Sequence, residues 1–156
     1  MQLVLLAGSG SGVGKTLLGT MLVEELRRRG LRVGVVKHVH HGVDYRVKDT
    51  GRYLEAGASR VVAAGPGEYM LVEPAALGFW DAVRLLGEVD VAVVEGFRLH
   101  IGEAVSKGGC VVYIDASRAE PLARGRLVEA CPGCLGAALE AVLGLLGEGG
   151  CSVGEV

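Results

Sequence analysis

The apolar and polar positions of the chain fall into alternating blocks that predict strands and helices in turn. Residues 2–7 form an unbroken apolar run, which is typical of a strand buried on both faces of a parallel sheet. Residues 15–29 place leucines on one helical face and end in arginines, with a glycine just beyond, as helix C-termini do. Residues 32–37 are again strand-like. Further strands are expected over 60–64, 69–72, 89–94 and 110–114, and further helices over 50–57, 75–87 and 134–146.

This order of elements predicts an α/β fold with a mainly parallel central sheet flanked by helices. Within the helix expected over 75–87, the pattern turns Leu77, Trp80, Leu85 and Leu86 toward the core. The chain has 156 residues, of which 50% are hydrophobic and 22% charged, a balance that suits one globular domain. We predict this single domain over 1–146 and a flexible, glycine-rich tail over 147–156.

Charge and hydropathy exclude several classes of partner. The formal net charge is −2, so the chain has no overall basic field to hold nucleic acid, and we expect none. No apolar stretch reaches the roughly 20 residues that span a bilayer, which predicts no membrane partner. The apolar start lacks the basic segment of a secretion signal, so a cytoplasmic location is expected, with the four cysteines as thiols.

The segment between the first strand and the first helix carries the strongest chemical signal. Its residues are Gly10, Ser11, Gly12, Val13, Gly14, Lys15 and Thr16. They match the phosphate-binding pattern GxxxxGK[ST], with Ser9 at the first glycine position. Backbone N–H groups at a helix N-terminus form a cradle for phosphate, where Lys15 is expected to reach the β- and γ-phosphates and the Thr16 hydroxyl to ligate Mg²⁺. The sequence therefore predicts a P-loop NTPase fold that binds a nucleotide.

A carboxylate ligand for the metal is expected where a strand beside the first one ends, because ligands bind there in open α/β sheets. Glu95 closes the strand 89–94, and we predict that it binds Mg²⁺ directly or through water. Asp44 and Asp49 follow the strand 32–37 and are further candidates to contact Mg²⁺ or to orient the attacking water, unless they are simply solvated. We count Lys15, Asp49 and Glu95 as the candidate catalytic residues.

Three of the four histidines lie within four positions after the second strand. Lys37, His38, His40 and His41 are predicted to contact the phosphates or a pterin substrate. A transition-metal site and a polar loop with a locally bonded histidine are the alternatives, since metal sites draw ligands from more than one element.

Two of the four cysteines form a CxxC pattern before the last predicted helix. Cys131 and Cys134 fit a redox-active pair, because a helix N-terminus lowers a thiol pKa. They also fit half of a zinc site completed by Cys110 and Cys151, or a structural role as thiols or a disulfide. A single CxxC favours the structural role.

Several further motifs follow the P-loop in a definite order. They are Lys37-His38-x-His40-His41, Lys48-Asp49-Thr50, Glu55-Ala56-Gly57-Ala58 and Val94-Glu95-Gly96-Phe97. In combination they resemble the molybdopterin-guanine dinucleotide biosynthesis protein B (MobB) family, over residues 2 to about 98. Val47 departs from the family, which has a glycine there, and the C-terminal third matches no family pattern.

This resemblance implies a GTP-binding protein of a dimeric P-loop class that serves the last step of molybdenum cofactor maturation. In that step a MobA-type nucleotidyltransferase joins GMP to molybdopterin, and the MobB-like protein presents GTP–Mg²⁺ and hydrolyses it only slowly. The implied partners are GTP, molybdopterin or the molybdenum cofactor, the transferase and a second copy of the chain. Asparagine is absent, so the Asn-Lys-x-Asp guanine motif is missing and the guanine preference follows from the resemblance alone.

Two other functions are compatible with the same motifs. A nickel-delivery GTPase would bind metal with the histidines and cysteines. A small P-loop kinase would phosphorylate a metabolite and would need an arginine-rich lid. The slow accessory role fits the residues better, because no residue plainly supplies a general base and no arginine finger follows the P-loop.

Overall fold

The computed structural model of the chain describes residues 1–39 and 49–154. The chain forms two compact units, whereas the sequence predicts one domain. Unit 1 consists of Met1–His38 and Phe79–Val156, and unit 2 consists of Val39–Gly78.

Unit 1 is built on a six-stranded sheet. Its strands are β1 (Gln2–Gly8), β2 (Val33–Lys37), β5 (Val91–Glu95), β6 (Cys110–Ile114), β7 (Leu122–Arg124) and β8 (Leu127–Ala130). Their order is β2-β5-β1-β6-β8-β7, and all neighbours are parallel except β7, which pairs antiparallel with β8. The predicted mainly parallel α/β sheet is therefore confirmed, and β1 lies between β5 and β6.

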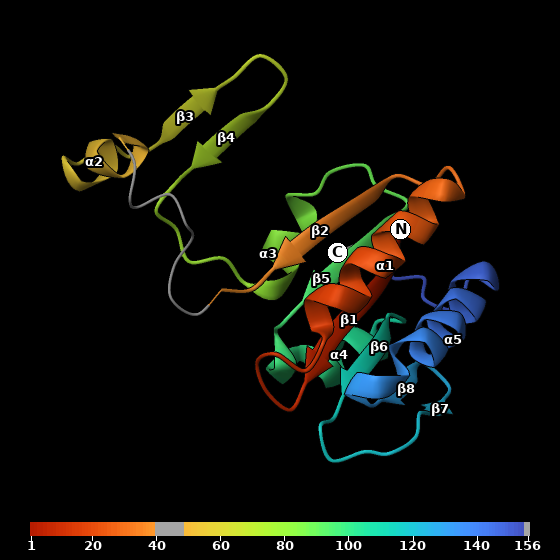
Figure 1. Ribbon diagram of the computed structural model, residues 1–156. Coiled ribbons are helices and arrows are strands. Elements are labelled where there is room, and N and C mark those ends of the chain that lie inside the picture. Colours follow the sequence, from red (N-terminus) through yellow and green to blue (C-terminus); the bar gives the residue numbers. More distant parts are fainter. Residues whose placement is uncertain (40–48, 155–156) are drawn as a thin grey trace. The chain divides into compact units, whose positions relative to one another are not determined.

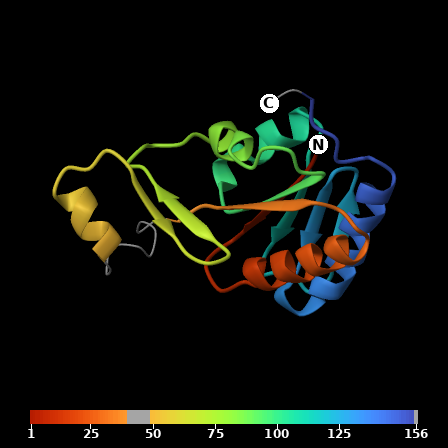
Figure 2. The ribbon, with the colours of Figure 1, turned by 90° about the horizontal axis from the view of Figure 1, so that it is seen from above.

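Helices cover both faces of this sheet (Figure 2). They are α1 (Lys15–Arg28), α3 (Phe79–Arg84), α4 (Ile101–Ser106) and α5 (Leu135–Gly147), with short 3-10 turns η1 (Arg98–His100) and η2 (Pro132–Cys134). Figure 2 shows α1 and α5 on one face and α3 and α4 on the other. Successive residues of β1 pack toward opposite faces, with Val4 and Leu6 in the core under α1 and Leu3 and Leu5 in the other. This double burial is the reason why residues 2–7 form an unbroken apolar run.

The structure differs from the sequence prediction around α3. The helix predicted over 75–87 is shorter, and its buried residues are Phe79 and Val83, one turn apart. Leu77 precedes the helix and is exposed, and Leu85 follows it and is also exposed. Trp80 and Leu86, also predicted to turn inward, are partly buried against this core, so the prediction is confirmed for these two and wrong for Leu77 and Leu85. The elements η1, α4, β7 and β8 were not predicted.

The C-terminal segment returns to the sheet, in contrast to the flexible tail predicted over 147–156. Cys151 is fully buried and forms a disulfide with Cys110 of β6. Its carbonyl accepts a hydrogen bond from the Leu3 N–H (2.9 Å), and the Val153 N–H donates to the Met1 carbonyl (3.1 Å). The glycines of this segment suggested a tail, but the apolar side chains among them pack into the core.

Unit 2 contains α2 (Asp49–Glu55) and the antiparallel hairpin formed by β3 (Val61–Ala64) and β4 (Tyr69–Val72), labelled in Figure 1. Directly opposed residues of a hairpin share one face. One face therefore carries Val62, Leu71 and Tyr69, and all three side chains are exposed. Throughout the part of the chain that the structure describes, no helix is long and apolar enough to cross a membrane.

Candidate functional site

The glycine-rich loop between β1 and α1 is anchored to the strand next to it. At the end of β1, the Ser9 N–H donates a hydrogen bond to the Ile114 carbonyl (2.9 Å). The Ser9 hydroxyl then accepts a hydrogen bond from the Ala116 N–H (3.1 Å). The serine that stands at the first glycine position thus links the loop to the segment after β6.

The loop ends at Gly14, which has a left-handed backbone (φ 105°) and lies directly before α1. A Cβ at this position would also lie 2.9 Å from a methyl carbon of Leu135, so only glycine fits. α1 begins at Lys15, and its free N–H groups open on the loop. The Lys15 ammonium bends back over the loop and donates to the Gly10 carbonyl. A backbone cradle with an ammonium above it is an anion-binding geometry.

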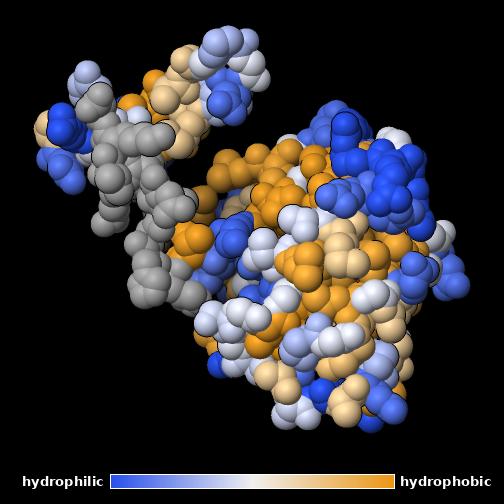
Figure 3. Space-filling model, in the orientation of Figure 1, coloured by the Kyte–Doolittle hydropathy of each residue, from blue (hydrophilic) through white to orange (hydrophobic). Residues whose placement is uncertain are grey.

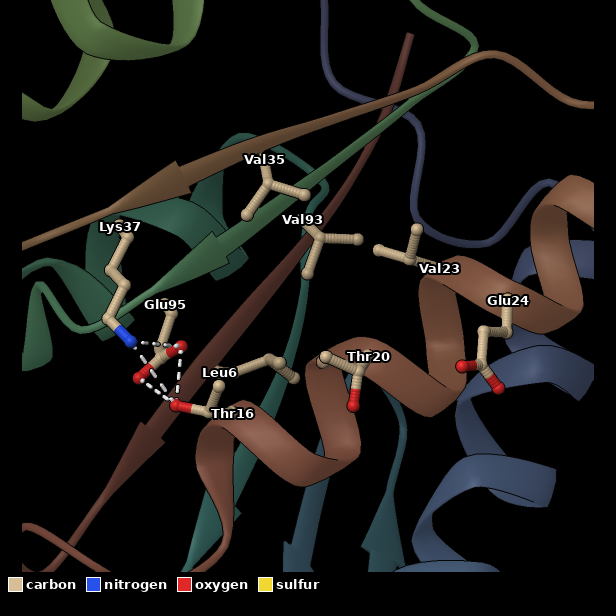
Figure 4. Close-up of a pocket in the computed structure, with 10 residues that line it drawn as sticks. Leu6, Thr16, Thr20, Val23, Glu24, Val35, Lys37, Val93 and Glu95 are labelled. Carbon is tan, nitrogen blue, oxygen red and sulfur yellow. Dashed lines mark hydrogen bonds and ion pairs between the residues drawn. The ribbon is translucent and has the colours of Figure 1, made fainter.

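A cluster of three polar side chains lies beside the loop (Figure 4). The Thr16 hydroxyl donates to the carboxylate of Glu95, whose two oxygens lie 2.9 and 3.0 Å away. The Lys37 ammonium lies 3.6 Å from Glu95 Oε2 and donates to Thr16 Oγ1 at 3.4 Å. The carboxylate is only 15% exposed, so its contacts are partly screened from water. The hydroxyl and carboxylate oxygens are ligands of the kind that Mg²⁺ prefers.

The residue after Glu95 brings β5 close to the end of β2. Gly96 has φ 98°, and a Cβ there would lie 2.7 Å from the Cβ of His38. The His38 N–H donates to the Glu95 carbonyl (2.9 Å), and the His38 ring lies 4.6 Å from the ring of Phe97. Phe97 itself has a left-handed backbone (φ 49°). His38 is therefore beside the strand end that carries Glu95.

An apolar hollow of about 400 Å³ extends from this cluster between α1 and the β2–β5 edge of the sheet. Leu6, Val23, Val35 and Val93 line its apolar part. Figure 4 shows these side chains converging, with Lys37 and Glu95 at one end. Figure 3 shows the hydrophobic surface that runs along β2 beside α1.

The other predicted site residues lie elsewhere. Asp49 begins α2 in unit 2, and its side chain is outside the described part of the chain. His40, His41 and Asp44 lie outside the described residues altogether.

All four cysteines are paired in the structure. Cys110 is bonded to Cys151, and Cys131 is bonded to Cys134 in the turn before α5. The thiols expected from the sequence are thus disulfides, as the structural alternative had allowed. Among residues 1–39 and 49–154, no three histidine, cysteine or acidic side chains are grouped so as to hold a metal ion.

One polar side chain next to the loop was missed by the sequence reasoning. Asp115 directly follows β6, whose residue Ile114 pairs with Gly8 at the start of the loop. Hydrogen bonds from the backbone N–H and then the hydroxyl of Ser117 hold the pKa of the Asp115 carboxyl below its usual range. The signal available was an aspartate at a strand end, but its position next to β1 depends on the strand order.

Comparison with known sequences identifies one family. Residues 3–106 match the family "Molybdopterin guanine dinucleotide synthesis protein B". A molybdopterin-guanine dinucleotide biosynthesis adapter protein from Haemophilus influenzae is 38% identical over 104 residues, which are 62% of this chain and 58% of that protein. The protein of the same description from Escherichia coli is 34% identical over 96 residues, 56% of this chain and 55% of that protein. The match thus spans little more than half the length of these relatives.

Solved structures show the same fold. Bacillus subtilis MobB superposes with a TM-score of 0.64 at 20% identity, over 92% of this chain and 97% of that one. A MobB homologue from Bacillus stearothermophilus gives a TM-score of 0.55 at 21% identity, over 95% of this chain and 97% of that one. The P-loop α/β architecture predicted from the sequence is confirmed.

Proposed function

The chain belongs to the molybdopterin guanine dinucleotide synthesis protein B (MobB) family, and on this premise we propose that it binds GTP with Mg²⁺. It acts as an accessory protein in molybdopterin guanine dinucleotide biosynthesis. There it assists a MobA-type nucleotidyltransferase that attaches GMP to molybdopterin. The curated relatives are described as adapter proteins of this biosynthesis. The family match over residues 3–106 reaches all the elements that carry the site, namely β1, α1, β2 and β5.

The observation that carries the proposal is the geometry at the start of α1. The loop from Gly10 to Gly14 supplies backbone N–H groups. Lys15 adds an ammonium whose hydrogen bond to the Gly10 carbonyl can be replaced by one to a phosphate oxygen. Negative phosphate at this position also interacts favourably with the positive end of the helix dipole. The P-loop thus provides charge and hydrogen bonds for a triphosphate.

Thr16 and Glu95 would hold the magnesium ion, because a hydroxyl and a carboxylate of these two residues are already in contact and Mg²⁺ favours oxygen ligands. The bound ion would neutralise charge on the terminal phosphates. Lys37, which contacts both Thr16 and Glu95, would balance the charge of the carboxylate and reach the same phosphates. Asp49 and the histidines His38, His40 and His41 remain predicted contacts of the nucleotide or the cofactor.

Slow hydrolysis follows from the same contacts. Both oxygens of Glu95 accept from Thr16, and Lys37 lies against one of them, so this carboxylate is engaged at the metal site. Activation of a water needs a free base within hydrogen-bonding reach. We therefore propose weak GTPase activity and a role in presenting the nucleotide. The apolar hollow beside the cluster gives another molecule access to this end of the site.

We further propose that the protein acts as a homodimer in the cytoplasm. The bare hairpin face of Val62, Leu71 and Tyr69 supports an interface with a second copy. Exposed apolar side chains that gather on one face are typical of a surface that binds another protein.

The test is calorimetric titration of GTP–Mg²⁺ and ATP–Mg²⁺ into the wild type and Lys15→Ala. Lys107→Ala is the matched control, because Lys107 precedes β6 at the amino ends of the parallel strands, whereas the loop follows β1 at their carboxyl ends. We expect GTP to bind more tightly than ATP, Lys15→Ala to lose about 100-fold or more in affinity, and Lys107→Ala to bind as the wild type does. Equal loss in both variants, or binding unaffected by Lys15→Ala, contradicts the proposed site.

A further inference from the structure

The two sides of the P-loop carry different chemistry. On the β5 side, Thr16, Glu95 and Lys37 form the cluster that suits the metal and the terminal phosphates. A triphosphate is an extended chain, so its nucleoside end points away from the terminal phosphate. Because β1 lies between β5 and β6, we expect the base of a bound nucleotide on the side of the segment that follows β6.

That segment, residues 115–121, is attached to the P-loop by backbone contacts. The Ser9 N–H donates to the carbonyl of Ile114, and the Ala116 N–H donates to the Ser9 hydroxyl. Arg118 extends from the segment to Glu129 of β8, with 2.9 Å between Nη2 and Oε2. The segment therefore has a defined position relative to the loop.

The first residue of the segment is Asp115. Its Oδ1 accepts hydrogen bonds from the Ser117 N–H (2.9 Å) and the Ser117 hydroxyl (2.8 Å). Within the described chain, Oδ2 receives no hydrogen bond, and the residue is only partly buried. The contacts with Ser117 and the nearby Arg118 charge keep the pKa of this carboxyl low. At neutral pH it is an oriented group that only accepts hydrogen bonds.

An ionised carboxylate discriminates between purines. The Watson–Crick edge of guanine presents two adjacent donors, N1–H and the N2 amino group, which match the two oxygens of a carboxylate. Adenine presents one amino donor beside the acceptor N1, whose lone pair faces the carboxylate. The carboxylate thus gains two charge-assisted hydrogen bonds with guanine and one bond opposed by repulsion with adenine.

We infer that Asp115 is the residue that selects guanine, by accepting hydrogen bonds from N1–H and the N2 amino group of the base. This inference rests on the proposed GTP-binding function and extends it to a specificity-determining residue. Ser117 is a positioning residue that holds the carboxylate. Asp115 lies beyond residues 3–106, so the family match does not assign this role. The chain has no asparagine, and a carboxylate beside the loop supplies guanine recognition without one.

The test compares three nucleotides, each with Mg²⁺, in calorimetric titrations: GTP, ATP and xanthosine triphosphate. Xanthine keeps N1–H but has a carbonyl oxygen in place of the amino group. Asp115→Asn keeps an oxygen for Ser117 or N1–H and adds an amide donor for that carbonyl. We expect Asp115→Asn to lose about 10- to 100-fold in GTP affinity and to gain affinity for xanthosine triphosphate. Glu120→Gln, which removes another exposed carboxylate from the same segment, should leave all three affinities unchanged.

Three results would overturn the inference. If Asp115→Asn binds GTP as the wild type does while Lys15→Ala loses it, the proposed function stands and the inference is wrong. If Asp115→Asn weakens all three nucleotides equally, the residue has a structural role only, and circular dichroism with a thermal unfolding curve will show whether the fold has changed. If the wild type binds no nucleotide, or Lys15→Ala changes nothing, the proposed function itself fails and the inference with it.

Discussion

Similar apolar sequences are buried in the sheet of unit 1 and exposed in the hairpin of unit 2. In β1, Leu5 is fully buried, whereas in β4 Leu71 is 50% exposed and Tyr69 is 77% exposed. The difference in burial follows from the number of strands and helices that surround each strand. β1 has strands on both sides and helices on both faces, while a two-stranded hairpin has one neighbour and is marginally stable by itself. Unit 1 therefore holds most of the buried apolar core, whereas the described hairpin of unit 2 leaves apolar side chains exposed.

The largest expected effect is the loss of stability when a buried leucine of β1 is shortened, compared with the same change in the hairpin. Leu5→Ala should lower the free energy of unfolding by about 4 kcal/mol, because it leaves a cavity in a closed core. Leu71→Ala should change it by less than about 0.5 kcal/mol at protein concentrations low enough to keep the chain monomeric, because that side chain then faces water. Urea denaturation followed by circular dichroism measures both values. Equal losses would show that the hairpin face is covered in the isolated protein.

The next effect is the loss of stability when a disulfide of unit 1 is removed. The Cys110–Cys151 disulfide closes a loop with a sequence separation of 41, so replacing both cysteines by alanine should cost up to about 4 kcal/mol. The Cys131–Cys134 disulfide spans only 3 positions, and its double alanine variant should cost less, since the loop-closure entropy is smaller. The same denaturation experiment without reductant compares the two pairs. A greater loss for the short loop would contradict this ranking.

A charge on the bare hairpin face tests what that face is for. Leu71→Lys should weaken self-association by about 10-fold or more, since an ammonium would have to be desolvated in the interface. The unfolding midpoint of the monomer should stay unchanged. Leu122→Lys, on the exposed edge strand β7 of unit 1, is the matched control and should leave association unaffected. Sedimentation velocity over a range of protein concentrations distinguishes the variants. A wild type that stays monomeric at every concentration rules out the dimer.

The smallest effect is a pH dependence within unit 1. Hydrogen bonds from the Arg32 side chain, and next from its backbone N–H, hold the pKa of the Asp90 carboxyl below its usual range. A carboxyl with a lowered folded pKa stabilises the protein above its unfolded pKa of about 4, and this contribution is lost as the pH falls through the lower folded value. Asp90→Asn should therefore have a lower urea midpoint than the wild type at pH 7, and the difference should shrink as the pH falls from about 4 through the lower folded pKa. A constant difference across this range would mean that the charge is not the cause.

Much of the site could be predicted because the residues that form it are close in sequence. The P-loop follows a strand and opens a helix within seven positions, and spacing alone predicts the N–H cradle and Lys15. Glu95 was predicted because it ends a strong apolar strand. Its contact with Thr16, 79 positions away, confirms that the two side chains meet. Asp115 ends a strand in the same way, yet nothing in the sequence says that β6 pairs with β1 rather than with an outer strand.

The sequence by itself determined the alternation of strands and helices, the P-loop and the family, because periodicity and spacing act over a few residues. Only the tertiary structure decided the strand order that places Glu95 on one side of the P-loop and Asp115 on the other. It also decided that the glycine-rich C-terminus returns to β6 through Cys151, and that the hairpin face stays bare. These features depend on which segments, distant in the sequence, pack against one another and remove apolar surface from water. The free energy of this burial comes from contacts across the whole sheet, so no single stretch of sequence determines it.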